Sequence, residues 1–354
     1  LPLLTRRSDL FDIVGIVDVD PAALERTGNR WNVEHGAHFQ DVASMVDATD
    51  IDALLVMNSG QHSDSVITGL NHGLAVLCEK PLAYSQAEVD RVRAALESGG
   101  GSLLIGYMKT RDPAVRQAQD FIGRRRARAI DVEVVHPSEA RQLLTGELAH
   151  QTKAIPSGLP HPANSGVEEA FGCEASPYED LYSGILLGSV IHEFSVLRAL
   201  GTPLCLVDYA QWIRGDGLDA TVIIVGTGPS GESITIRWYY LDSHPTYRET
   251  VHWIGDDCDV TIEFPAPYVL HAPTIATMRE AAGAGAETTT FTSHRSAFEV
   301  ELEDFASALR TDRGSSEACG DAQADVNLAQ QVVQLIAAKE GVPLMGELAS
   351  KVAR

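Results

Sequence analysis

The sequence predicts an α/β domain with a parallel sheet, followed by an α+β domain with an open antiparallel sheet. A length of 354 residues suits about two domains. Early in the chain, short unbroken apolar runs alternate with helical patterns, which is typical of parallel strands covered on both faces. Later in the chain, strand-like segments follow one another and are joined by turns, which indicates an antiparallel sheet. We expect the two domains to cover residues 1–106 and 107–354.

Four apolar runs predict the strands of the first domain, at residues 11–17, 51–57, 74–78 and 102–105. A helix is expected to begin at Asp20-Pro21, with the aspartate as N-cap and the proline as the first helical residue. A second helix is predicted over 62–72, and Ser85 and Glu88 form a capping box at the start of a third. Nucleotides bind such sheets at the carboxyl ends of the strands, so we expect a ligand site there.

In the second domain, a helix over 113–122 leads to a strand over 129–135. A polar stretch rich in Pro, Gly and His follows, and then a helix over 186–200. Further strands are expected at 206–213, 220–225, 233–241, 247–254 and 260–264, and two amphipathic helices at 298–309 and 326–336. We expect residues 137–182 and one face of the sheet to line a substrate pocket, with candidates chosen by location alone: His150, His161, Tyr178 and Tyr182.

Composition excludes several classes of partner. The chain carries 49 acidic and 27 basic side chains, for a net charge of −22, whereas a nucleic-acid partner requires a basic surface. No apolar run reaches the roughly 18 residues of a membrane-spanning helix, so no membrane partner is expected. The five cysteines include no close pair and no CxxC motif, so we expect free thiols, no metal site and a cytoplasmic protein.

The segment Glu79-Lys80-Pro81 directly follows an apolar strand, at the edge of the sheet where ligands bind. A lysine held there among apolar residues can have its pKa lowered by desolvation and can then donate or accept a proton. The alternative is a surface ion pair between Glu79 and Lys80 at the end of a strand.

This segment resembles the EKP motif of the glucose–fructose oxidoreductase, inositol dehydrogenase and rhizopine-catabolism protein family (Gfo/Idh/MocA). Residues 14–21 (VGIVDVDP) resemble the second strand of that family, 106–109 (GYMK) the start of its second domain, and 183–201 the helix with its catalytic histidine. The resemblance implies a Rossmann-like domain that binds a nicotinamide dinucleotide, and an α+β domain for substrate binding and oligomerisation. It also implies hydride transfer between nicotinamide and a hydroxyl carbon of a sugar- or cyclitol-like substrate.

The resemblance implies two catalytic residues. Lys80 would contact substrate and cofactor, and His192 would exchange the hydroxyl proton, which suits histidine because its ordinary pKa lies near working pH. Lys109 would lie near the substrate, where Tyr182 is also placed by location. The alternatives are a histidine packed on a helix face and an exposed lysine.

On the cofactor side, the resemblance implies contacts from Asp18, Asn58, His62 and Glu79. An acid at the end of the strand before Asp20 accepts hydrogen bonds from ribose hydroxyls and repels a 2′-phosphate, so NAD is expected rather than NADP. The alternatives are a turn residue at position 18 and a helix-start histidine at position 62.

Three positions depart from the family pattern. No GxGxxG-type turn precedes residues 1–10, which look like the helix after such a turn, so we expect that the chain begins partway through the domain; the alternative is a member that has lost normal dinucleotide binding. Gly188 stands where an acid usually lies four residues before the histidine, and Glu193 points about 100° away from His192. Met57-Asn58 replaces a Thr-Pro pair.

The sequence therefore favours an NAD(P)-dependent oxidoreductase acting on a sugar- or cyclitol-like alcohol. One alternative is a redox-idle family member that binds a sugar ligand or serves as a partner subunit; another uses transient oxidation to assist elimination or glycoside cleavage. We also expect a homodimer or homotetramer formed through the open sheet, with Ile234, Ile236 and Trp238 as apolar outer positions.

Overall fold

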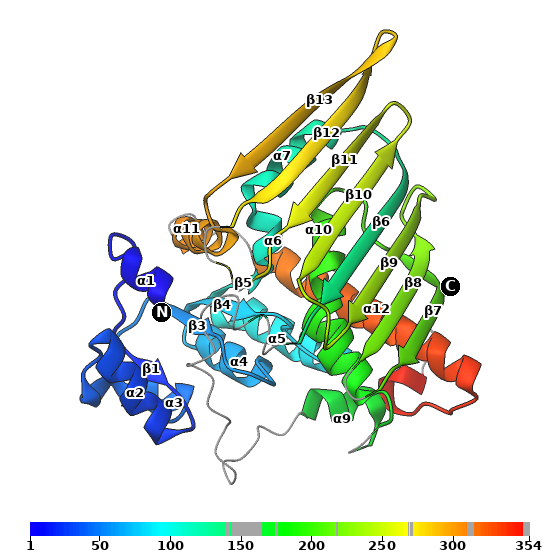
Figure 1. The fold of residues 1–354 in the computed structure, drawn as a ribbon. Helices are drawn as coiled ribbons and strands as arrows, with labels where there is room; N and C mark the ends of the chain where they lie inside the picture. The colour runs from blue at the N-terminus through cyan, green and yellow to red at the C-terminus, as the bar shows by residue number, and fades with distance from the viewer. Residues whose placement is uncertain are drawn as a thin grey trace.

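The computed structural model describes residues 1–138, 142, 165–173, 176–216, 219–267, 269, 272–309 and 315–349. Short parallel strands and their helices come first in the chain, and a broad eight-stranded sheet follows them (Figure 1). Tyr178, Tyr182 and every other site residue singled out above lie within these ranges, whereas His150 and His161 lie outside them.

The parallel strands before residue 107 form two separate sheets. Strands β3 (Ala53–Val56), β4 (Ala75–Glu79) and β5 (Ser102–Gly106) pair in that order, while β1 (Ile16–Val17) pairs with β2 (His38–Phe39). Residues 75–78 are all buried, as expected for a strand covered on both faces. The prediction of a strand over 11–17 was too long, because only its last two residues pair with a neighbour.

The helices of this region begin where the sequence places their caps. An Asp20 carboxylate oxygen accepts a hydrogen bond from the Ala22 amide at the start of α2 (Pro21–Trp31). The Ser85 hydroxyl accepts one from the Glu88 amide at the start of α5 (Gln86–Gly99). The other helices here are α1 (Pro2–Arg6), α3 (Val42–Ala48) and α4 (Ser63–Asn71). Both predicted caps are confirmed.

The large sheet has eight strands in the order β13-β12-β11-β10-β6-β9-β8-β7. Their bounds are β6 (Ala127–His136), β7 (Leu206–Arg214), β8 (Ala220–Thr227), β9 (Ser233–Tyr240), β10 (Arg248–Gly255), β11 (Cys258–Phe264), β12 (Thr274–Ala282) and β13 (Gly285–Ser293). The sheet is mixed rather than wholly antiparallel, because β6 runs parallel to β9. The chain passes through several helices between β6 and the other strands, and such a long connection allows a parallel pair.

One expectation about this sheet was wrong, and two of its strands were not expected. Ile234, Ile236 and Trp238 are buried, with at most 5% exposed, so they face the core and not an outer surface. Strands β12 and β13 were not predicted, because their sequences lack a clear alternation of large apolar residues and β13 is exposed along most of its length.

Helices cover the inner face of the large sheet and join it to the parallel sheet (Figure 1). The described helices from residue 108 onward include α6 (Met108–Arg111), α7 (Pro113–Ile122), α9 (Ser165–Phe171), α10 (Ile191–Ala199), α11 (Ala297–Leu309), α12 (Ser315–Glu340) and the 3₁₀ turn η3 (Gly346–Ala349). Of these, α7 packs on β11, β12 and β13, and α12 packs on both β7 and β5. A further 3₁₀ turn, η1 (His35–Ala37), lies between α2 and β2. The Tyr107 hydroxyl at the end of β5 donates a hydrogen bond to Asp325 on α12, and Arg198 on α10 pairs with the same carboxylate. The two sheets are thereby held together by buried polar contacts as well as by apolar packing.

The helix predicted over 186–200 has a different form in its first half. Residues Asp180–Val190 form a π-helix, η2, which continues directly into α10. A π-helical segment is rare and is frequently found at a functional site. Within η2, a Cβ atom at position 188 would lie 3.0 Å from the carbonyl oxygen of Ser183, whereas one at position 184 would meet nothing within 4 Å. The backbone therefore favours glycine at position 188 specifically.

We predict that Gly184→Ala stabilises the protein by about 0.5–1 kcal/mol, because alanine restricts the unfolded chain more than glycine does. Gly188→Ala gains the same backbone term but crowds the Ser183 carbonyl, so its free energy of unfolding should lie below that of Gly184→Ala. Urea unfolding followed by circular dichroism measures both variants. Equal stabilisation at the two positions would contradict the packing argument.

Candidate active site

Lys80 connects the parallel sheet to the helix that carries His192. The lysine directly follows β4, and its Nζ atom donates a hydrogen bond to the carbonyl oxygen of Gly188 in η2. Gly188 precedes His192 by four residues, which is about one helical turn. Burial lowers the pKa of the Lys80 ammonium, and Glu79 opposes this effect. The structure thus brings the lysine of the EKP segment and the turn before the histidine into direct contact.

His192 lies near the start of α10 and keeps part of its side chain exposed. Its Nδ1 atom is buried and has no hydrogen-bond partner among the described residues. Burial lowers the pKa of His192 well below its ordinary value, and the neighbouring Lys80, Lys109 and His136 add to the effect. The imidazole is therefore neutral at physiological pH and is suited to accept a proton.

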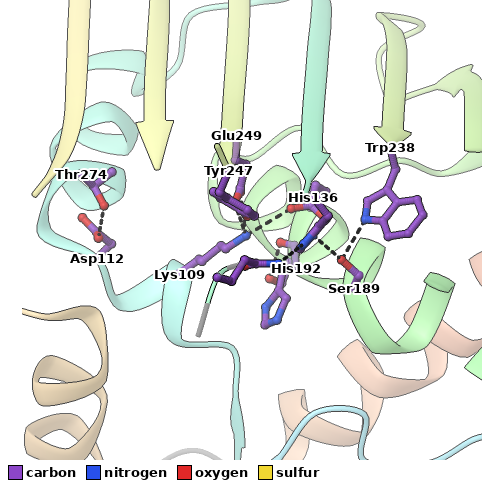
Figure 2. A network of polar contacts seen from close by, with 12 residues as sticks. Lys109, Asp112, His136, Ser189, His192, Trp238, Tyr247, Glu249 and Thr274 are labelled. Atoms are coloured by element: carbon purple, nitrogen blue, oxygen red, sulfur yellow. Dashed lines mark hydrogen bonds and ion pairs between the residues drawn. The ribbon is translucent and has the colours of Figure 1, made fainter. Parts of the chain in front are cut away.

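A buried ionic cluster lies beside His192 (Figure 2). The Lys109 ammonium on α6 contacts both carboxylate oxygens of Glu249 on β10 at 2.6 Å and one oxygen of Glu193 on α10 at 3.2 Å. The Tyr247 hydroxyl donates a further hydrogen bond of 2.5 Å to Glu249. We call these four residues the Lys109 cluster. Its positive charge is matched inside the protein, since Lys109 is only 8% exposed.

The carboxyl groups of the Lys109 cluster set the charge of the site. Burial raises the pKa of Glu193 to about 8, an effect that Lys109 opposes and Glu249 reinforces. Burial also lowers the pKa of Lys109, but Glu249 and Glu193 outweigh it and the net effect raises that pKa. Lys109 is therefore an ammonium ion at neutral pH, while Glu193 keeps a proton more readily than an ordinary glutamate.

A histidine that the sequence analysis missed completes the polar surroundings (Figure 2). His136 ends β6, with its Nε2 atom 3.1 Å from the Ser189 hydroxyl, which also accepts a hydrogen bond of 2.9 Å from Trp238 Nε1. Its ring lies 5.0 Å from that of Tyr247. Burial, with Lys109 nearby, lowers the pKa of His136 to about 4, so this ring is also neutral.

The sequence contains a signal for Glu249 but only a weak one for His136. Glu249 alternates with Val251 and Trp253 on the inward face of β10, so a charged residue stands in a row of core positions. A carboxylate on such a face requires a buried partner, which the structure supplies as Lys109. His136 is marked only by its place at the carboxyl end of a predicted strand.

The residues expected on the cofactor side lie at the carboxyl ends of three parallel strands. Asp18 is exposed after β1, with one carboxylate oxygen 2.8 Å from the Asp20 amide. Asn58 follows β3 and donates from its side chain to the carbonyl oxygens of Ser59 and Gln61. Glu79 ends β4, where burial raises its carboxyl pKa against the effect of Lys80. Carboxylates and an amide at this edge fit the hydroxyl and amide groups of a dinucleotide.

The tyrosines chosen by location lie in the core. Tyr182 is fully buried, and its hydroxyl donates a hydrogen bond of 2.7 Å to the carbonyl of Tyr84. Tyr178 is 1% exposed and donates to Glu340. Neither side chain has an exposed face for a substrate, because η2 and the turn before it direct both rings inward.

The described ranges contain no group of three or more His, Cys, Asp or Glu side chains arranged to hold a metal ion. Cys78, Cys205, Cys258 and Cys319 are free thiols. None of the helices in the described part of the chain combines the length and the apolar character that crossing a bilayer requires.

Known sequences match the first part of the chain. The model of an oxidoreductase family with an NAD-binding Rossmann fold, Gfo/Idh/MocA, matches residues 1–107. Inositol 2-dehydrogenase of Ralstonia nicotianae is 32% identical over 125 residues, 34% of this chain and 36% of the relative. Inositol 2-dehydrogenase 3 of Saccharopolyspora erythraea is 28% identical over 121 residues, 34% of this chain and 35% of the relative. The matches thus span about a third of the length of these curated relatives.

Known structures resemble the whole chain. Myo-inositol 2-dehydrogenase from Lactobacillus plantarum superposes with a TM-score of 0.68 at 18% identity, covering 96% of this chain and 93% of that one. Aldose-aldose oxidoreductase from Caulobacter crescentus gives a TM-score of 0.67 at 16% identity, with 96% and 93% coverage. At these identities the likeness to solved structures establishes the fold. Residues 1–107 match the Gfo/Idh/MocA oxidoreductase family, so this part of the chain is related to the NAD-binding Rossmann domain of those oxidoreductases.

Proposed function

We propose that the protein is an NAD-dependent dehydrogenase that oxidises a secondary alcohol of a sugar or cyclitol. The observation that carries this proposal is the contact of Lys80 Nζ with Gly188, one turn before His192. It joins a cationic residue at the carboxyl edge of the parallel sheet to a neutral histidine in the other half of the molecule. The relatives named inositol 2-dehydrogenase support a cyclitol-like substrate.

In this proposal, His192 and Lys80 act on the hydroxyl group of the substrate. When bound, the nicotinamide cofactor supplies the acceptor for the hydride. His192 accepts the hydroxyl proton, because its depressed pKa keeps the imidazole neutral. The Lys80 ammonium stabilises the negative charge that develops on the oxygen, and it does so strongly because the site is partly shielded from water. A neutral histidine between cationic residues favours the direction of alcohol oxidation.

We assign the cofactor contacts to Asp18, Asn58 and Glu79. Each lies at the carboxyl end of a parallel strand, where doubly wound sheets bind nucleotides. We do not assign a cofactor contact to His62, because its side chain is 3% exposed and both ring nitrogens face backbone carbonyl oxygens. The exposed carboxylate of Asp18 repels a 2′-phosphate, so we propose NAD rather than NADP. Residues 1–106 would bind the cofactor, and residues 107–354 would bind the substrate and a second copy of the chain. The partly exposed Ile223, Val225 and Ile254 on the sheet face away from the core support a homo-oligomer.

We propose a structural role for Lys109 and not the direct substrate contact that its position suggests. Its charge is matched by Glu249, and it also contacts Glu193, so we propose that it holds these two carboxyl groups at the wall of the substrate site. One oxygen of Glu193, Oε2, is buried without a partner among the described residues. A substrate hydroxyl or a water molecule is the natural donor for that oxygen.

One observation favours a second candidate, a redox-idle member that binds a sugar ligand. Position 188 carries no acid, and η2 disfavours any side chain there. This candidate predicts that a polyol stabilises the protein against heat while no NADH forms.

The test incubates the full chain with NAD and a panel of polyols that includes myo-inositol, and follows NADH absorbance. We predict that Lys80→Met lowers turnover by at least about 100-fold, because the charge that stabilises the developing alkoxide is lost. Lys339→Met, on α12 beside Tyr209, is the matched control and should keep full activity. Absence of turnover together with absence of NADH binding would contradict the dehydrogenase, and an equal loss in both variants would contradict the role of Lys80.

A second prediction separates the two acids of the Lys109 cluster. Glu249→Gln should destabilise the protein by about 3–5 kcal/mol, because it leaves the buried ammonium without its main partner. Glu193→Gln should be tolerated at neutral pH, because Glu193 already tends to hold a proton there. Thermal unfolding over a range of pH measures both.

The pH dependence has a definite sign. The raised pKa of Glu193 means that the folded state binds its proton more tightly than the unfolded state. This residue therefore lowers stability as pH rises from its ordinary 4.5 through about 8. Glu193→Gln lacks this loss, so its stability relative to the native protein should increase across that window. A constant difference across the window would contradict the placement of the proton.

A further inference from the structure

His62 lies between the two loops that follow β3 and β4. Its Nδ1 atom is 2.7 Å from the carbonyl oxygen of Pro81, and its Nε2 atom is 2.7 Å from that of Asn58. The side chain is 3% exposed. We infer that His62 carries a proton on each ring nitrogen and, as an imidazolium, positions Lys80.

The hydrogen-bond geometry requires the second proton. A carbonyl oxygen only accepts hydrogen bonds, and a neutral imidazole offers a single N–H donor. In a neutral His62, the lone pair of the other nitrogen would face a carbonyl oxygen at 2.7 Å and repel it. Turning the ring over does not help, because ring carbons would then stand at these short distances. Both contacts are favourable only when both nitrogens donate.

The surroundings supply a counter-charge. Burial prevents water from taking over either ring contact, so the charge must be balanced inside the protein. Glu79, the last residue of β4, is close enough for His62 to favour its ionised form. Lys80 faces the same carboxylate. Glu79 is thus the acidic group that balances the imidazolium.

The hydrogen bond from His62 restrains the backbone next to Lys80. Pro81 follows Lys80 directly, and His62 holds the Pro81 carbonyl, one residue beyond the α-carbon that carries the lysine side chain. The second bond holds the Asn58 loop, whose side chain is tied to Gln61. A lysine has four rotatable bonds and loses entropy when ordered, so a restrained backbone makes its reach to Gly188 reproducible. His62 is accordingly a positioning residue; the importance of Lys80 itself rests on the proposed function.

The protonation state is tested by nuclear magnetic resonance of the full chain labelled with ¹⁵N-histidine, at neutral pH and without ligand. Comparison with His62→Gln assigns the ring signals. We expect both nitrogens of His62 to show the shifts of protonated imidazolium. His38 is the internal comparison, because its Nε2 atom faces a single carbonyl, that of Val33. An unprotonated nitrogen in His62 would overturn the inference.

The positioning role of His62 is tested by the nuclear magnetic resonance signal of Lys80. Lysines are reductively methylated with ¹³C, and the Lys80 signal is assigned by its absence in Lys80→Met. We expect the signal to shift and broaden in His62→Gln but not in the matched His38→Gln. An unchanged Lys80 signal in folded His62→Gln would overturn the role; if that variant does not fold, the ring spectrum of the native chain decides. Neither readout needs turnover, so a failed NADH assay would reject the dehydrogenase and leave this inference standing.

Discussion

The proposed site depends on one contact, the hydrogen bond from the Lys80 ammonium to the Gly188 carbonyl. It links the end of β4 to the π-helix before His192, across the junction of the two sheets. Residues from distant parts of the chain form a single site only if that junction is rigid. Apolar packing and the buried Tyr107–Asp325–Arg198 contacts make it so. Gly188 serves this contact through its backbone, where an acid would offer a side chain.

The site also depends on the arrangement of its charged and neutral side chains. Lys80 and Lys109 stand near two neutral histidines, His136 and His192, whose pKa values are depressed by burial first and by these cations second. Buried acids match the cations, so the site carries separated charges without a large excess of either sign. Such a site is preorganised for an alcohol that becomes more negative as it reacts.

Local sequence signals predict local structure well in this chain. The Ser85 cap, the edge position of Lys80 and most strands follow from patterns within about ten residues, and the structure confirms those elements. The Lys109 cluster could not be predicted this way, because Lys109 and Glu249 lie 140 residues apart and meet only through the packing of α6 on β10. Tyr182 was chosen because it lies in the segment expected to line the substrate pocket, but its side chain is fully buried in the core. Its place in the sequence did not determine the direction in which the helix points its side chain.

The most direct test of the central claim is a crystal structure of the full chain with NADH and the polyol that stabilises it most against heat. We predict that one hydroxyl of the polyol lies within hydrogen-bond distance of both Lys80 Nζ and a ring nitrogen of His192. A polyol bound elsewhere, or one that touches only one of these two groups, would contradict it.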